Sequence, residues 1–380
     1  MPDLTSTNTA RTGAPGSAQP EPAVRTNRPS RKITMLAASG AGKTCYLRAM
    51  FARMSLGWEG LTFDLDQDTE QQLLDEYDQM ENPSGEDRWP PPTAEEPQRY
   101  EFRLRVAHKE VETYEWIDYR GGTLDAKPGE SDYDALLDHL MASDGVLVCV
   151  SGQQLATIGA DMTLARAAKI QSMNRFLREL ESRAVAANRP RPGVGIIVTK
   201  SDYISDIDAL ETRLRGLFSS LFAPESDWQT AILPVTLGPE LANHEGDPDV
   251  PLSPKQIELP LVYAIRCSLA HAVDEANQEA NHAAMELNAL KRSEAQQSES
   301  MKQAAGRGVW GRFGAWWRSD ESLADMILKL NRNQQQIEAT DRDLGERLEQ
   351  LQVVKAALRR ITTGLRGYSV YVSGRKESIE

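Results

Sequence analysis

Residues 37–44 read Ala-Ala-Ser-Gly-Ala-Gly-Lys-Thr, and this glycine-rich segment constrains the fold more than any other feature of the chain. It follows the apolar, β-prone run 33–36 and precedes a helical pattern at 45–51. Glycines at a strand-to-helix turn let backbone N–H groups surround an anion at a helix N-terminus, whose dipole favours negative charge. Ala37 departs from the usual motif, which begins with glycine. An ordinary turn is the alternative, but the flanking strand and helix favour a phosphate-binding loop.

The phosphate-binding loop predicts roles for individual side chains. Lys43 is expected to reach the β- and γ-phosphates of a nucleotide, and the Thr44 hydroxyl is expected to ligate Mg²⁺. Mg²⁺ is therefore the predicted cofactor. The predicted phosphate contacts in this loop are Ser39, Gly40, Ala41, Gly42, Lys43 and Thr44.

A second motif, Thr199-Lys200-Ser201-Asp202, closes the apolar run 194–198, which is typical of a buried strand. Sheets of α/β proteins bind ligands at the carboxyl ends of their strands. There the Asp202 carboxylate can accept both the ring N–H and the exocyclic amine of guanine, a donor pair that adenine lacks. Each hydrogen bond to a charged group contributes about 1.5–3 kcal/mol, so base choice can rest largely on this residue. A polar turn is the alternative, and the upstream phosphate loop favours guanine recognition.

The two motifs together resemble those of Ras-like phosphate-loop GTPases. More narrowly, the chain is similar to the bacterial double-GTPase families, which are components of multi-protein conflict and signalling systems. The resemblance covers residues 31–275. It implies a phosphate-loop GTPase domain, GTP or GDP as the ligand, and hydrolysis of GTP as the activity.

The resemblance assigns roles to residues between the two motifs. Residues 114–121 end in Asp-x-x-Gly, so Asp118 would hold Mg²⁺ through water and the Gly121 N–H would sense the γ-phosphate. Asp-x-x-Gly is a common string that often marks a simple turn, but its order and its place at a strand end favour this assignment. Members of the family also use a threonine before the second strand to close over Mg²⁺. Thr93 is the candidate for that role and Thr62 is its competitor.

The last base-contacting loop of the family is expected at Thr236 and Leu237, after an apolar run at 231–235. The predicted guanine contacts are Thr199, Lys200, Asp202, Thr236 and Leu237.

Catalytic residues are harder to assign from the motifs. Many GTPases place a glutamine after Asp-x-x-Gly to orient the attacking water, and this chain has Gly122 there. Ser39 occupies a loop position where a bare glycine often admits an arginine finger. Arg120 is a candidate arginine finger within the chain, with a solvated loop arginine as the alternative. Because phosphoryl transfer depends on positioning and charge stabilisation, hydrolysis is expected to be slow without a partner or a second protomer.

The composition excludes several classes of protein. A net charge of −13 argues against a general nucleic-acid or anionic-membrane surface. The widely spaced Cys45, Cys149 and Cys267 lie in apolar patterns typical of reduced core thiols, and the five histidines form no ligand cluster. Since no apolar run approaches the ~18 residues of a spanning helix and no signal-peptide core is present, we expect a cytoplasmic protein.

Helical and strand patterns alternate through 31–275, which predicts an α/β fold with a doubly wound, mainly parallel sheet. Residues 1–30 have almost no bulky apolar side chains and are predicted to be a disordered tail. Residues 64–97 form a long polar insertion at the position of the switch region, with a short helix at 68–80. The further predicted elements are helices at 133–141, 164–187 and 208–222 and strands at 145–150 and 231–235.

Residues 276–366 are predicted to be a helical coiled-coil extension, followed by a tail at 367–380. Apolar residues recur there at an unbroken spacing of seven: Leu323, Leu330, Ile337, Leu344, Leu351, Leu358 and Leu365. Such a pattern over more than ~3–4 heptads is typical of a coiled coil. An antiparallel hairpin is the simplest architecture, and an intermolecular homodimer is the alternative.

The stretch 306–318 between the two helical arms holds three of the seven tryptophans and three arginines, with no acidic residue. Such a tip can pack back onto the arms, or it can dock on a protein partner or a membrane interface. The acidic chain disfavours nucleic acid.

Three functions remain open from the sequence. The first is a GTP-dependent switch enzyme that signals through its coiled coil, and the second is a nucleotide-binding scaffold with little hydrolysis. An ATPase is third, because it requires the guanine motif to be a coincidence.

Overall fold

The computed structural model describes residues 30–82, 88–91, 97–106, 109–119, 121–244, 247, 249–306 and 323–379. Four groups of residues on which predictions fall lie outside the described residues: 1–29, Thr93, Arg120 and 307–318.

Among the described residues, nine strands form one sheet in the order β2-β3-β4-β1-β5-β6-β7-β8-β9. The central strands are parallel: β4 (Lys109–Asp118), β1 (Arg31–Ala37), β5 (Ser143–Ser151), β6 (Gly193–Thr199) and β7 (Gln229–Pro234). The strands at the two edges are antiparallel: β2 (Leu61–Asp64), β3 (Gln98–Val106), β8 (Ser369–Val372) and β9 (Arg375–Ser378). The sheet is therefore mixed, and the predicted doubly wound parallel arrangement describes only its centre. Consecutive strands form the antiparallel pairs β3–β4 and β8–β9, which need only short connections, whereas long stretches of chain separate β2 from β3 and β7 from β8.

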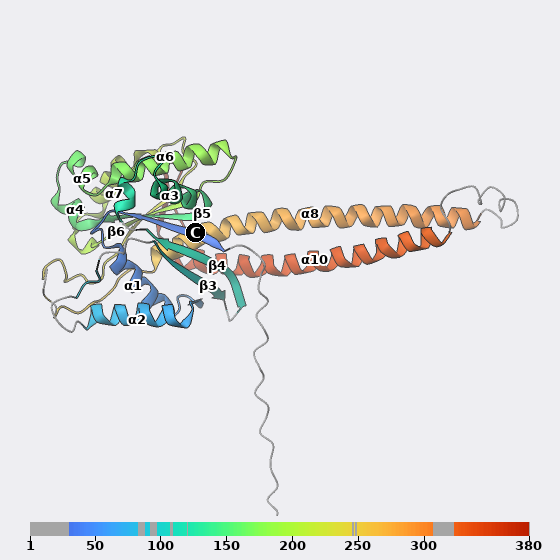
Figure 1. The fold of residues 1–380 in the computed structure, drawn as a ribbon, viewed down its shortest axis with the longest axis horizontal. Helices are drawn as coiled ribbons and strands as arrows, with labels where there is room; N and C mark the ends of the chain where they lie inside the picture. Colours follow the sequence, from blue (N-terminus) through green and yellow to red (C-terminus); the bar gives the residue numbers. More distant parts are fainter. Residues whose placement is uncertain are drawn as a thin grey trace, which may run out of the picture.

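Helices cover both faces of the sheet (Figure 1). One face is covered by α1 (Lys43–Ser55) and α8 (Leu259–Gly306), and the other by α3 (Ser131–Ala142), α6 (Ile170–Ala186) and α7 (Ile207–Leu217). Side chains alternate between the two cores along each central strand: Met35 points to the α1 side and Leu36 to the α6 side. Burial on both faces explains why the central strands read as continuous apolar runs.

The predicted insertion contains α2 (Gln67–Glu81), which packs against α1. Asp66 caps α2 by accepting a hydrogen bond from the Thr69 N–H at 3.0 Å. The buried Arg48 guanidinium of α1 is ion-paired with Glu76 of α2. The insertion is thus attached to the helix that follows the phosphate loop.

Several predicted boundaries differ from the structure. The single helix expected at 164–187 is broken into α5 (Asp161–Ala167) and α6, because Lys169 adopts a left-handed φ of 56°. The helix expected at 208–222 ends at Leu217 and continues as a 3-10 turn. Residues 367–380, expected to be a tail, contain β8 and β9, whose Lys376 donates to Glu211 of α7 at 2.8 Å.

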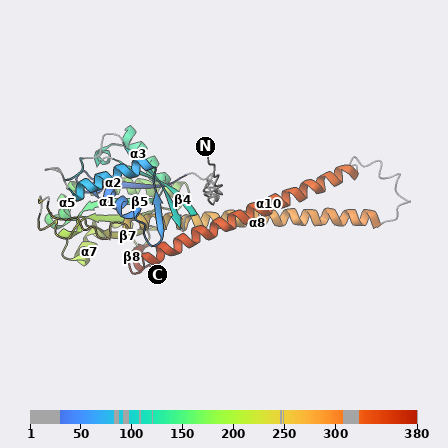
Figure 2. The same cartoon turned by 90° about the horizontal axis from the view of Figure 1, so that it is seen from below.

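The C-terminal helices α8 and α10 (Leu323–Gly364) form an antiparallel hairpin that projects from the domain (Figures 1 and 2). Polar contacts between the two helices fix their register: Arg347 to Glu279 at 3.0 Å, Lys355 to Asn277 at 3.3 Å and Asn333 to Gln297 at 3.1 Å. Three small side chains of α8 are buried along this arm: Ala276, Ala280 and Ala283. The predicted helical extension therefore exists as an intramolecular hairpin.

The heptad residues play two different roles along α10. Ile337 and Leu344, farther from the domain, are only partly buried between the arms. Leu351 and Leu365 are both buried. Leu365 and the nearby Ala357 belong to the core that also contains residues of α1 and of the central strands. The proximal half of α10 is thus part of the α/β domain rather than of an extension beginning at residue 276.

An ion-pair cluster around the mostly buried Arg31 side chain fixes the point where α8 leaves the sheet. Arg31, at the start of β1, contacts Glu112 at 3.1 Å, Asp144 at 3.0 Å and Glu275 of α8 at 2.5 Å. Because one guanidinium bonds groups from β4, β5 and α8, the direction of the hairpin is tied to the sheet.

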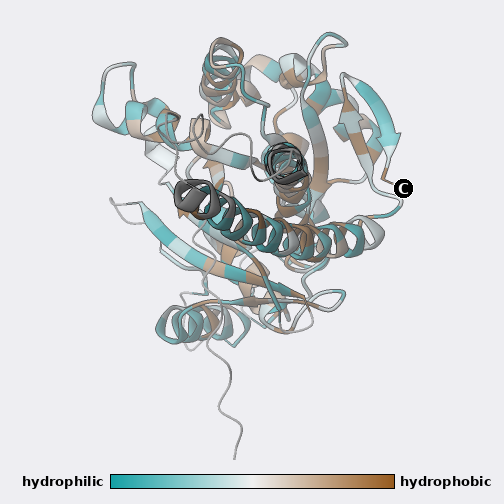
Figure 3. Cartoon of the chain, turned by 90° about the vertical axis from the view of Figure 1, so that its right-hand side faces the viewer, coloured by the Kyte–Doolittle hydropathy of each residue, from teal (hydrophilic) through white to brown (hydrophobic). Residues whose placement is uncertain are grey.

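Viewed along the hairpin, hydrophobic residues concentrate on the central strands, and hydrophilic residues are frequent along the outer helices (Figure 3). No helix in the described part of the chain combines the length and the apolar character needed to cross a bilayer.

The core position of α10 predicts a contrast between two adjacent alanines, Ala357 (fully buried) and Ala356 (exposed). Ala357→Leu inserts a larger side chain between α10 and the sheet and should cost about 1–3 kcal/mol of unfolding free energy. The melting temperature, followed by circular dichroism, should fall by about 2–10 °C. Ala356→Leu is the matched control and should melt near the wild type. Equal melting temperatures for both variants would contradict this packing.

Candidate functional site: a cavity between the phosphate loop and the base motif

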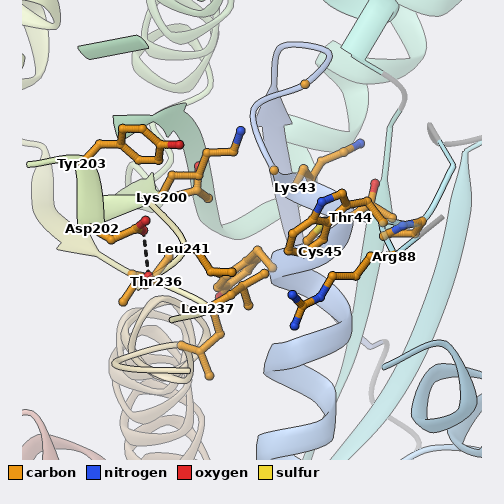
Figure 4. Close-up of a pocket in the computed structure, with 18 of the residues that line it drawn as sticks. Lys43, Thr44, Cys45, Arg88, Lys200, Asp202, Tyr203, Thr236, Leu237 and Leu241 are labelled. Atoms are coloured by element: carbon orange, nitrogen blue, oxygen red, sulfur yellow. Dashed lines mark hydrogen bonds between the residues drawn. The ribbon is translucent and has the colours of Figure 1, made fainter. Parts of the chain in front are cut away.

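A cavity of about 530 Å³ opens at the carboxyl ends of the parallel strands. The two predicted motifs line opposite sides of it, with Lys43 and Thr44 on one side and Lys200 and Asp202 on the other (Figure 4). Of the predicted site residues, those that line the cavity are Ser39, Gly40, Gly42, Lys43, Thr44, Gly121, Thr199, Lys200, Asp202, Thr236 and Leu237. The remaining described ones, Ala41 and Asp118, are buried directly behind them.

The phosphate loop has the backbone that its glycines predict. Gly40 and Gly42 adopt left-handed φ values of 75° and 82°, which a side chain would disfavour. Helix α1 begins at Lys43, directly after Gly42, and the Tyr46 N–H donates to the Gly42 carbonyl at 2.9 Å. The first N–H groups of a helix have no partner within the helix, so this turn offers donors and a positive dipole end to an anion.

Lys43 is buried, and its ammonium group is ion-paired with Asp118 at the end of β4. The same ammonium donates to the carbonyl oxygen of Tyr119. A buried ammonium is costly unless it is paired, and here a carboxylate and a carbonyl supply the compensating charge. A phosphate group entering the loop can take over this role.

The residues around Lys43 fit a magnesium ion. Thr44 contributes a hydroxyl to the cavity, and the Asp118 carboxylate, fully buried, lies beside Lys43. Mg²⁺ prefers oxygen ligands and is usually held by one or two protein groups together with substrate phosphates and water. Within the described residues no group of three or more His, Cys, Asp or Glu side chains could form an all-protein metal site. The donor set therefore suits a metal that arrives with phosphate.

Gly121 lies directly against the phosphate loop. A Cβ atom built on Gly121 would be 2.3 Å from the backbone nitrogen of Ser39 and 2.8 Å from the carbonyl carbon of Ala38. Only a residue without a side chain permits this backbone contact. Gly121 is therefore held against the backbone of the glycine-rich loop.

The opposite wall is built from the ends of β6 and β7. The Thr236 hydroxyl donates to Asp202 at 2.8 Å and accepts a hydrogen bond from the Gly238 N–H at 3.0 Å (Figure 4). Lys200 adopts a left-handed φ of 50°, and its ammonium donates to Gln153 at 2.9 Å. These contacts fix the Asp202 carboxylate at the cavity edge, where it can accept from a planar ligand with two adjacent donors.

Thr199 connects the two halves of the site. Its hydroxyl donates to the carbonyl oxygen of Ala41 in the phosphate loop at 2.5 Å. The Cys149 thiol donates to the same carbonyl at 3.5 Å. Since Thr199 is the residue at which β6 ends, this bond sets the distance between the phosphate loop and Asp202.

The two thiols near the loop are unsuited to nucleophilic chemistry. Burial raises the pKa of Cys45 to about 11 and that of Cys149 to about 12. Both groups therefore stay protonated at neutral pH. Cys149 is a buried core residue as predicted, whereas Cys45 is only partly buried and lines the cavity.

The sequence missed part of the wall. Arg88, Trp89, His244 and Asp247 also line the cavity. A Trp-Pro-Pro run follows Arg88 in the sequence, but no local signal places it beside the glycine-rich loop. Thr62, the competitor for the switch threonine, lies on edge strand β2 and does not line the cavity.

No protein-family model matches this chain, and no curated protein matches it. Solved structures similar to it include the signal recognition particle receptor SRb-GTP/SRX complex from Chaetomium thermophilum, at 16% identity and a TM-score of 0.32. That likeness covers 49% of this chain and 78% of the other. Another is the ADP-ribosylation factor-like GTP-binding protein, or small COPII coat GTPase SAR1, from Encephalitozoon cuniculi in complex with GDP. It is 12% identical, with a TM-score of 0.29, and the likeness covers 65% of this chain and 85% of that one. At such scores neither likeness decides a function, which is argued below from the site itself.

The contact between Gly121 and the phosphate loop predicts the effect of one methyl group. Gly121→Ala should displace the backbone at Ser39 and weaken GDP binding by at least about tenfold in a calorimetric titration. Gly159→Ala is the matched control, because a Cβ at Gly159 meets nothing within 4 Å. If both variants bind GDP as the wild type does, the close approach of Gly121 has no part in phosphate binding.

Proposed function

We propose that this chain binds GTP and GDP together with Mg²⁺, hydrolyses GTP slowly, and acts as a nucleotide-dependent switch in a bacterial multi-protein conflict or signalling system. The observation that carries the proposal is that the phosphate loop and Asp202 line the same cavity. The Thr199–Ala41 hydrogen bond connects the two sides of that cavity. A nucleotide has charged phosphates at one end and a hydrogen-bonding base at the other, and the cavity offers matching groups at its two sides.

Each half of the site has a defined task in this proposal. Lys43 would exchange its bond to Asp118 for the β- and γ-phosphates. The Thr44 hydroxyl and, through water, the Asp118 carboxylate would then hold Mg²⁺. When bound, Mg²⁺ neutralises phosphate charge and orients the terminal phosphate. Asp202 accepts from the guanine ring, with Thr236 fixing its orientation. Leu237 lines the cavity beside them and offers an apolar surface to the base.

Slow hydrolysis is expected because Gly122 has no side chain. Gly122 comes directly after Gly121, in the turn beside the phosphate loop, and so it cannot orient a water molecule. Phosphoryl transfer is accelerated almost entirely by positioning and charge stabilisation. A partner or a second protomer would then have to complete the site, and Arg120 remains a candidate from within the chain.

The helical hairpin is the part that would carry the switch to partners. Helix α8 begins at Leu259, two residues after Ile257, which lines the cavity. Helix α10 returns to the end of α1, where Gly364 lies against the ring of Trp58. We propose that a protein partner docks on the hairpin and on 306–318. A homodimer and peripheral membrane contact are further options. We propose no nucleic-acid partner, and we propose the cytoplasm as the site of action.

A GTP-binding scaffold with little hydrolysis is the second candidate, and Gly122 is the residue that favours it. A single-turnover assay with the protein in excess over radiolabelled GTP distinguishes the two. Conversion to GDP that is lost in a Lys43→Ala variant supports the switch, whereas GTP that stays bound and intact over hours supports the scaffold.

The base-reading role predicts a change of specificity for Asp202→Asn. Loss of the carboxylate should weaken GTP binding by about 1.5–3 kcal/mol, which is roughly 10- to 150-fold. XTP should bind the variant better than GTP, because xanthine has a carbonyl where guanine has its amine and an asparagine amide can donate to it. Competition against a fluorescent nucleotide measures both affinities.

Asp208→Asn, at an exposed position in the first turn of α7, is the matched control and should keep the wild-type preference. An Asp202→Asn variant that binds GTP and XTP as the wild type does would exclude Asp202 as the base reader.

A further inference from the structure

We infer that Arg88 holds the segment 88–91 in place along one side of the cavity and thereby slows release of the bound nucleotide. This arrangement of Arg88 and its two carbonyl partners is called the clasp below. This inference rests on the proposed function, because it concerns the same cavity. It adds a positioning residue that does not belong to either sequence motif.

Arg88 joins two parts of the chain that are far apart in sequence. Its Nε donates to the carbonyl of Met80, near the end of α2, at 2.8 Å. Its Nη1 donates to the carbonyl of Asp247, in the segment after β7, at 3.4 Å. One guanidinium therefore connects the insertion before β3 to the segment that follows β7.

The clasp borders the cavity directly. Arg88, Trp89, Pro90 and Pro91 all line it, as does Asp247. The Arg88 guanidinium lies over the ring of Trp89, 5.3 Å from its centroid, so the same group also orients this aromatic wall. In Figure 4, Arg88 lies beside α1, across the cavity from Asp202. The two prolines fix their own φ angles and stiffen the segment.

The charge of Arg88 is poorly compensated by the protein itself. Arg88 is only 4% exposed, and its buried Nη2 has no hydrogen-bond partner among the residues that the structure describes. Within the described ranges no carboxylate is ion-paired with it; both bonded acceptors are neutral carbonyls. Burial lowers the pKa of this guanidinium, and the nearby Asp247 carboxylate opposes that shift only in part. A buried cation without a paired carboxylate is unfavourable, so the position of Arg88 in the cavity wall carries an electrostatic cost.

An anionic nucleotide removes much of that cost. Its phosphates bring several negative charges into the cavity that Arg88 lines, and long-range attraction is weakly screened in a buried site. Nucleotide binding should then favour the closed clasp, and by thermodynamic reciprocity the closed clasp should favour the bound nucleotide. Arg88 lies in the cavity wall and belongs to neither sequence motif. Its loss should therefore act chiefly on the rate at which the nucleotide is released.

The test measures release of a fluorescent GDP analogue, displaced by excess unlabelled GDP in a stopped-flow instrument. Arg88→Met keeps the length and the apolar stem of the side chain but removes the guanidinium. The release rate should rise by about tenfold or more, while the association rate changes less than threefold. GDP should also raise the melting temperature of this variant less than that of the wild type.

Arg99→Met is the matched control, because Arg99 lies on β3 with a side chain that is 63% exposed and ion-paired to Glu115. It should release the analogue at the wild-type rate. If Arg88→Met fails to fold, Arg88→Lys replaces it: lysine keeps the charge but lacks the fork that spans two carbonyls. It should release at least about threefold faster than the wild type.

The outcomes separate this inference from the proposed function. A wild-type protein that binds no guanine nucleotide overturns both. A wild type that binds GDP, with Arg88→Met or Arg88→Lys releasing it at the rate of Arg99→Met, overturns the clasp alone.

Discussion

The hydrogen bond from the Thr199 hydroxyl to the Ala41 carbonyl is the contact on which the site depends. A phosphate loop alone accepts many anions, and an aspartate at a strand end alone is a polar turn. The bond contributes only about 1 kcal/mol of net stability, so its importance is geometric. It joins the turn before α1 to the end of β6, and so it sets the separation between the N–H groups of the glycine-rich loop and Asp202.

The rest of the fold supports this geometry. Parallel pairing of β1 with β4 and β5, and of β5 with β6, places Lys43, Asp118 and Thr199 at the same edge of the sheet. The Arg31 cluster at the opposite edge anchors α8 to three strands. Because α8 starts beside the cavity and α10 ends against the turn after α1, the hairpin is continuous with the elements that build the site.

Local patterns predicted the elements nearest the chemistry, and long-range contacts decided the rest. The strand, loop and helix around Lys43 and the strand ending at Thr199 were predictable, because burial on both faces and glycine-rich turns leave strong local signals. Strand β2 has only four residues. Strand β8 owes its place to pairing with β7, more than 130 residues away in sequence, and β9 pairs with β8. The break at Lys169 lies inside an otherwise continuous helical pattern. Arg88 was missed since its partners, Met80 and Asp247, are backbone carbonyls that leave no trace in sequence.

Calorimetric titration of the wild-type protein with GDP and with ADP, each with and without Mg²⁺, tests the central claim most directly. If Asp202 and the phosphate loop form one guanine-nucleotide site, GDP should bind with a stoichiometry of about one. ADP, which lacks the paired donors, should bind about 100-fold more weakly or not at all. Removal of Mg²⁺ should weaken GDP binding. Equal affinities for GDP and ADP, or tighter binding of ADP, would contradict the account.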